Sequence, residues 1–153
     1  MAIGEKRFLI KKECWKKHVH KSIMFRQAYL GNFKGVCTRV RITDNQAMVM
    51  IKDAYLEEQN MAYTYEIPLV DAEALIDRID TQVLSNIQHH IAYEGINWEV
   101  YEFLGVNAGL IIAVVKDCDD DTFVKPKWVG KEITNDKEYE NAVLIDKPYT
   151  KWP

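Results

Sequence analysis

Cysteine is scarce in this chain, and so is any long run of apolar residues. Three cysteines occur among 153 residues and none forms a C-x-x-C pair, which argues against a disulfide framework or a zinc site. The longest apolar run, residues 109–115, is too short to cross a bilayer. No signal peptide opens the chain. These absences predict a soluble cytoplasmic protein with reduced thiols and no membrane partner.

Positive charge is not in excess either. The chain carries 20 Lys and Arg against 23 Asp and Glu, a net charge of -3, whereas phosphate-driven nucleic-acid binding requires a basic surface. This balance argues against a general nucleic-acid binder and predicts no nucleic-acid partner, although one basic cavity remains compatible with it. The hydrophobic content of 48% is typical of a globular protein. The length predicts a single domain over residues 1–153.

The most informative stretch is CTRVRITDNQAMVMIKD at residues 37–53. Its β-branched and apolar residues predict two strands around a tight turn at residues 43–46. Because side chains alternate along a strand, Arg39 and Arg41 share one face, as do Met48, Met50 and Lys52 on the returning strand. If the two faces coincide, three cations lie beside methionine side chains. A solvated sheet face is the alternative interpretation of the same charges.

The same patterns predict about eight strands in all, nearly all of them antiparallel. The others cover residues 1–10, 24–30, 61–69, 83–93, 97–103 and 110–116, with turns at residues 31–32 and 94–95. Helices are predicted over residues 11–20, after an N-cap at Asp71, and near Asn135. Eight strands can close around one small ligand. We therefore predict an α+β fold, an eight-stranded antiparallel β-barrel tunnel with a few peripheral helices.

Several segments, in order along the chain, resemble the CYTH superfamily, the triphosphate tunnel metalloenzymes. They are EKRFLI at 5–10, RQAYL at 26–30, RVRI at 39–42, IK at 51–52, YEIPLVDAEAL at 65–75, WEVYEF at 98–103, NAGLIIA at 107–113 and WVGKEIT at 128–134. That group includes class IV adenylyl cyclases, thiamine triphosphatases and inorganic triphosphatases. The resemblance implies a tunnel that binds a polyphosphate among basic residues, with one or two divalent metals held by acids.

The chain departs from the family pattern mainly at acidic positions. The family's Glu-x-Glu-x-Lys corresponds to Ile3, Glu5 and Arg7. Other acids of the family are replaced, and the positions concerned are Ala62, Thr64, Tyr101, Val114 and Lys116. The family's Lys-x-Arg pair is replaced by Asn86 and Gln88. Magnesium and manganese need hard oxygen ligands, so these losses predict an anion site without its metal site.

The prediction that follows is metal-independent binding or sequestration of a phosphorylated small molecule, by a protein that is not an enzyme and has no cofactor. Arginine suits this function because its planar guanidinium binds phosphate bidentately. Amide and aromatic groups further predict a nucleotide-like ligand whose binding survives EDTA. The predicted ligand-binding residues are Arg7, Arg39, Arg41, Lys52, Lys116, Glu5, Thr64, Gln88, Tyr101 and Met50.

Two alternatives remain open, and an oligomer is compatible with each. One is a metal-dependent triphosphatase or nucleotidyl cyclase with a rearranged site that uses Glu5, Glu66 and Glu99. The other is an interaction protein with a vestigial tunnel. Metal-dependent turnover distinguishes the first alternative from the binding protein.

Overall fold

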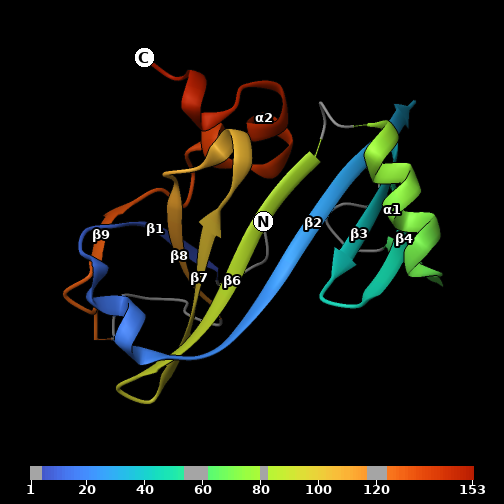
Figure 1. Ribbon diagram of the computed structural model, residues 1–153. Coiled ribbons are helices and arrows are strands. Elements are labelled where there is room, and N and C mark those ends of the chain that lie inside the picture. The colour runs from blue at the N-terminus through green and yellow to red at the C-terminus, as the bar shows by residue number, and fades with distance from the viewer. Residues whose placement is uncertain (1–4, 54–61, 80–82, 117–123) are drawn as a thin grey trace. The chain divides into compact units, whose positions relative to one another are not determined.

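Antiparallel strands make up most of the structure, a computed structural model that describes residues 5–53, 62–79, 83–116 and 124–153 (Figure 1). The strands are β1 (Lys6–Ile10), β2 (Val19–Phe33), β3 (Val36–Thr43), β4 (Gln46–Asp53), β5 (Ala62–Ile67), β6 (Val83–Tyr93), β7 (Ile96–Phe103), β8 (Ile111–Val115) and β9 (Val129–Glu132). The α-helices are α1 (Leu69–Arg78) and α2 (Asn141–Asp146), and short 3-10 helices are η1 (Glu13–His18), η4 (Gly105–Asn107), η5 (Lys137–Tyr139) and η6 (Tyr149–Lys151).

The strand order is β5-β4-β3-β2-β6-β7-β8-β1-β9. This confirms the predicted antiparallel α+β fold with few helices. The described part of the chain contains a nine-stranded sheet rather than an eight-stranded one, because β9 adds to β1. Strands β5 and β9 stand at the two ends of this order. The closure of the strands into a barrel stays a prediction.

The chain divides into two compact units. The first unit comprises Met1–Ile23 and Asn86–Pro153, and the second comprises Met24–Ser85. Strands β2 and β6 contribute residues to both units. The single domain expected over residues 1–153 stays a prediction.

In the first unit, one face of the strands is covered by a tryptophan-rich core. The ring centroids of Trp98 and Trp128 lie 5.5 Å apart, and Phe8 packs 5.9 Å from Trp98. Trp15 of η1 belongs to the same buried cluster. Because side chains alternate, residues next to these core positions in sequence lie on the opposite face.

In the second unit, α1 covers one face of strands β2, β3 and β4. Its residues Ala72 and Ile76 are buried against Ala28, Val40 and Ile42. Apolar residues four apart place these two helix side chains on one stripe. The odd-numbered residues of β3, including Arg39 and Arg41, consequently lie on the face away from α1.

Several predicted element boundaries require correction. Strand β2 does not end at residues 31–32 but continues to Phe33 across a register shift near Gly31. The turn instead uses Lys34 and Gly35, with φ of 52° and 85°, which suits a tight hairpin with two left-handed residues. Helix α1 begins at Leu69, two residues before the predicted N-cap Asp71.

The other predicted helices are also shorter than expected. The amphipathic helix over residues 11–20 is the 3-10 helix η1, and β2 begins directly after it. The helix expected near Asn135 is split into η5 and α2. Among the described residues, no helix combines the length and the apolar character needed to cross a membrane.

Candidate functional site

The arginine hairpin forms as the sequence predicts. Strands β3 and β4 pair in the register Arg39 with Met50 and Arg41 with Met48, around a turn at Asp44. Lys52 lies opposite Cys37 in the same ladder. Directly opposed residues in an antiparallel pair share a face. The two arginines, the two methionines and Lys52 therefore lie on one face.

Strand β2 supplies polar and aromatic partners to these arginines. The Nε of Arg41 donates to the Oε1 of Gln27 at 3.0 Å, and the guanidinium of Arg39 lies 5.2 Å from the ring centroid of Tyr29. Gln27 is buried. Sequence reasoning missed both partners, although the alternation within MFRQAYL at residues 24–30 places them on one face.

The Arg39 side chain carries a buried donor that the protein does not satisfy. Among the described residues, its Nε is buried and has no hydrogen-bond partner. Burial raises the pKa of the neighbouring Tyr29 hydroxyl, and the positive charge of Arg39 partly offsets this. The ring therefore remains neutral beside the guanidinium. An unsatisfied donor of this kind costs about 1–3 kcal/mol, which an anionic ligand would offset.

Thr64 and Glu66 of β5 extend this face beyond β4. Met50 lies opposite Thr64, and Met48 lies opposite Glu66. Thr64 and Glu66 are both exposed. The structure thus brings five predicted residues to the polar face of the second unit: Arg39, Arg41, Met50, Lys52 and Thr64.

The remaining five predicted residues belong to the first unit, on the face opposite its tryptophan core. Arg7 and Glu99 both lie opposite Val114, and Gln88 lies opposite Tyr101. The Nη2 of Arg7 donates to the backbone carbonyl of Tyr139 at 3.1 Å. This bond fixes the guanidinium with one of its five donors.

Glu99 is the centre of the hydrogen bonds on this face. Tyr101 donates its hydroxyl to the Oε2 of Glu99 at 2.7 Å, and the Nζ of Lys116 lies 3.5 Å from Oε1. Burial raises the pKa of Tyr101 strongly, and the negative charges of Glu99 and Glu5 raise it further, while Arg7 lowers it. Tyr101 is therefore a neutral donor, and the charges of Glu5, Arg7 and Glu99 all act on it.

The first unit offers two carboxylates to a metal rather than a complete metal cage. In the described ranges, no group of three or more His, Cys, Asp and Glu residues is placed to hold a metal ion. Protein-bound Mg²⁺ usually needs one or two carboxylates together with substrate phosphates. The two carboxylates are Glu99, which accepts from Tyr101, and Glu5, whose charge acts on Tyr101. Ile3 lies outside the described residues.

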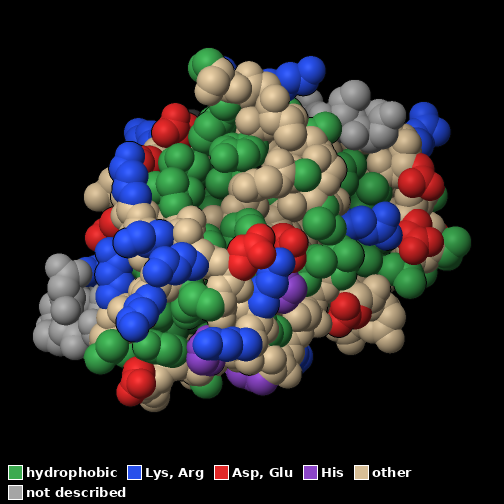
Figure 2. Space-filling model, turned by 60° about the vertical axis from the view of Figure 1, so that its left-hand side comes forward, with side chains coloured by type: hydrophobic (Ala, Val, Ile, Leu, Met, Phe, Trp, Pro, Cys, Tyr) green, Lys and Arg blue, Asp and Glu red, His purple; other side chains and the backbone are tan. Residues whose placement is uncertain are grey.

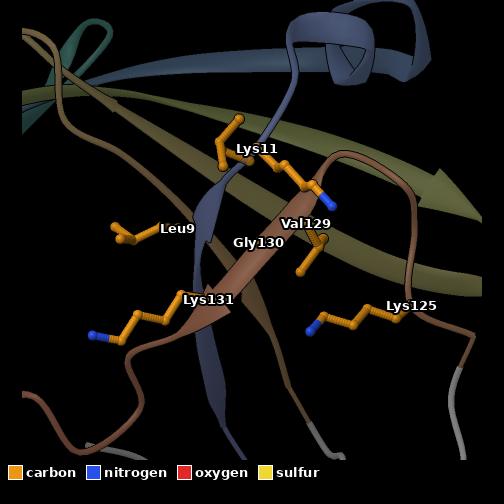
Figure 3. A pocket seen from close by; sticks show the side chains of 7 residues that line it. Leu9, Lys11, Lys125, Val129, Gly130 and Lys131 are labelled. Carbon is orange, nitrogen blue, oxygen red and sulfur yellow. The ribbon is translucent and has the colours of Figure 1, made fainter.

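A shallow hollow of about 450 Å³ lies elsewhere on the first unit, over β1 and β9. Leu9, Ile10 and Val129 supply its apolar part, and its cations are Lys11, Lys125 and Lys131. In Figure 3, Lys11 and Lys125 lie on the same side of β9 as Val129, and Lys131 points to the other side with Leu9. Figure 2 shows lysine and arginine side chains gathered beside hydrophobic ones. None of the predicted site residues lines this hollow.

Comparison with known proteins identifies a relative that matches almost the whole chain. An inorganic triphosphatase of Acetivibrio thermocellus is 33% identical over 147 residues, which cover 95% of this chain and 94% of the relative. The crystal structure of the inorganic triphosphatase NE1496 matches with a TM-score of 0.74 at 23% identity, over 92% of this chain and 95% of that one. At that identity the structural likeness concerns the fold alone. No family model matches the chain.

These findings correct two expectations from the sequence. The relative is an enzyme, so the prediction of metal-independent binding or sequestration was wrong, as was the prediction that the chain is not an enzyme. The error came from counting lost acids, because a metal that binds through substrate phosphates needs few protein carboxylates. The identity over 95% of the chain and the shared fold show that this protein belongs to the CYTH, or triphosphate tunnel metalloenzyme, superfamily.

Proposed function

We propose that this protein is a metal-dependent triphosphatase whose substrate is inorganic triphosphate. The 33% identity with the Acetivibrio thermocellus enzyme carries the proposal. The polar faces of the two units support it, because each offers groups that the reaction requires. Hydrolysis of a phosphoanhydride depends mainly on positioning and on stabilisation of developing negative charge.

The polar face of the second unit suits the phosphate groups. Arg39 presents a buried Nε without a partner among the described residues, and Arg41 is oriented by Gln27. Guanidinium groups stay charged and bind phosphate oxygens through two parallel hydrogen bonds. A phosphate oxygen at Arg39 would satisfy a donor that the fold leaves unsatisfied. We assign Arg39 and Arg41 to substrate binding.

The polar face of the first unit suits a divalent cation. Glu5 and Glu99 would hold it. Glu99 would then give up its contact with Lys116, whose Nζ lies 3.5 Å from Oε1 of Glu99 and whose side chain is half exposed. A divalent cation supplies charge neutralisation and polarises the phosphoryl oxygen. Arg7, fixed by the carbonyl of Tyr139, contributes a cation on the same face.

The test is release of inorganic phosphate from triphosphate with magnesium, with manganese, and with EDTA, with ATP in parallel. We expect turnover of triphosphate that requires the metal. Arg41→Ala should lower kcat/KM by about 10²–10³-fold, the usual effect of removing a group that stabilises the transition state. Absence of metal-dependent turnover by the folded wild type would overturn the proposal, and turnover of ATP alone would shift the substrate to nucleotides.

Arg26 provides the matched control for Arg41. It lies on β2 in the same unit, on the opposite face, and its Nη2 lies 3.7 Å from Glu73. Arg26→Ala should leave turnover unchanged, because this side chain does not lie on the proposed phosphate face. Equal losses in the two variants would mean that the arginines act through general charge.

We also propose a cytoplasmic location. Cys14 and Cys37 are free thiols, which persist most readily in a reducing compartment. Cell fractionation with antibodies to the chain tests this.

A further inference from the structure

Three side chains of the first unit form a continuous hydrogen-bonded chain from a hydroxyl to a carboxylate. The Oγ of Ser22 on β2 lies 2.7 Å from the Nδ1 of His89 on β6. The Nε2 of the same ring lies 3.0 Å from the Oε1 of Glu102 on β7. Strand β6 lies between β2 and β7 in the sheet (Figure 1), so the central residue of the chain comes from the central strand.

The chemistry of the three groups fixes the direction of the hydrogen bonds. An ionised carboxylate only accepts hydrogen bonds, so Glu102 accepts from an Nε2–H of His89. In the tautomer that carries its hydrogen on Nε2, the Nδ1 has a lone pair, which accepts the hydroxyl hydrogen of Ser22. This order of hydroxyl, imidazole and carboxylate is the one that activates a serine as a nucleophile.

The surroundings hold the base and expose the hydroxyl. Only 14% of the His89 side chain is exposed, and its ring packs 5.0 Å from the buried Trp15. Ser22 itself is exposed. The imidazole is thus fixed and shielded from water, while a substrate from solution can reach the serine oxygen.

This group lies away from the face that carries the proposed triphosphatase residues of this unit. His89 lies opposite Val100, which shares the buried core with Trp98. Glu102 has the same parity along β7 as these two residues, whereas Glu99 and Tyr101 have the other. The triphosphatase proposal therefore makes no use of Ser22, His89 or Glu102.

We propose that Ser22 is a nucleophile for acyl transfer from small activated esters, with His89 as its general base. The Oγ forms a bond to the ester carbonyl carbon while its proton passes to the Nδ1 of His89. The bond from that carbon to the alcohol oxygen breaks, and the alcohol leaves with the proton. Water then attacks the acyl-serine through the same base, which releases the carboxylic acid and restores Ser22. Glu102 is a positioning residue that stabilises the imidazolium.

The experiment uses p-nitrophenyl acetate on the full chain, with peptide mapping by mass spectrometry. The chain contains two serines, Ser22 and Ser85, so Ser85 is an internal control. We expect acetylation of Ser22 about 100-fold faster than that of Ser85, since a general base contributes about 10²–10⁴-fold. His89→Gln should remove this advantage. Similar rates at the two serines, or an unchanged rate in His89→Gln, would overturn the proposal.

Two further variants separate chemistry from structure. Glu102→Gln should slow acetylation, and Glu102→Asp should restore part of the rate, because the carboxylate charge rather than the side-chain shape is required. Equal rates in these two variants would contradict the positioning role. Ser22→Ala should abolish acetylation at this position and leave release of phosphate from triphosphate unchanged, so failure of either proposal does not affect the other.

Discussion

Replacing Tyr101 with Phe tests the centre of the polar face in the first unit. The change removes the hydroxyl that donates to the Oε2 of Glu99 at 2.7 Å and keeps the ring. A hydrogen bond to a charged group contributes about 1.5–3 kcal/mol. Because 22% of the Glu99 side chain is exposed, water can partly replace the hydroxyl. We therefore expect a loss near the lower end, about 1.5 kcal/mol.

Thermal unfolding monitored by circular dichroism measures this loss of stability. For a chain of about 150 residues, 1 kcal/mol corresponds to roughly 2–4 °C, so Tyr101→Phe should lower Tm by about 3–6 °C. Tyr65→Phe is the matched control, since the Tyr65 side chain is 58% exposed on β5, and its Tm should stay at the wild-type value. An unchanged Tm in Tyr101→Phe would refute the reasoning, because the hydroxyl would then add nothing to the fold.

Three other predictions follow from the same two units. Lys116→Met should change the free energy of unfolding by less than about 1 kcal/mol, as for other exposed ion pairs. It should lower the Mg²⁺ concentration needed for half-maximal triphosphatase activity, because Glu99 loses a competing cation, and an unchanged Mg²⁺ titration would contradict this. Burial, followed by the charge of Glu99, raises the pKa of Tyr101, so the unfolded chain releases a proton above about pH 10 that the folded chain keeps. The free energy of unfolding should therefore fall as the pH rises above about 10. Measured by urea titration, its slope against pH should be shallower in Tyr101→Phe than in the wild type by about 1.4 kcal/mol per pH unit, and equal slopes would refute this prediction. Ile76→Ala should cost about 2–5 kcal/mol in urea unfolding, because its side chain is 4% exposed under α1, and a loss below 1 kcal/mol would mean that the helix repacks.

The sequence by itself determined most of the strands and which residues of a strand share a face. Alternation of apolar residues along β3 and β4 was enough to place Arg39 and Arg41 together, because successive side chains point to opposite faces. The tight turns at Asp44 and Glu94 were also predicted, and both residues have positive φ. The segments shared with the CYTH superfamily supplied the fold before any contact was known.

Only the tertiary structure decided which strands are neighbours and which side chains meet. Strand parity gives the face of Ser22, His89 and Glu102, but the hydrogen bonds between them depend on the order β2-β6-β7. The pairing of Glu99 with Tyr101 and Lys116 likewise sets which carboxylate oxygens are engaged. A one-dimensional pattern encodes local periodicity, whereas contacts between distant segments depend on register.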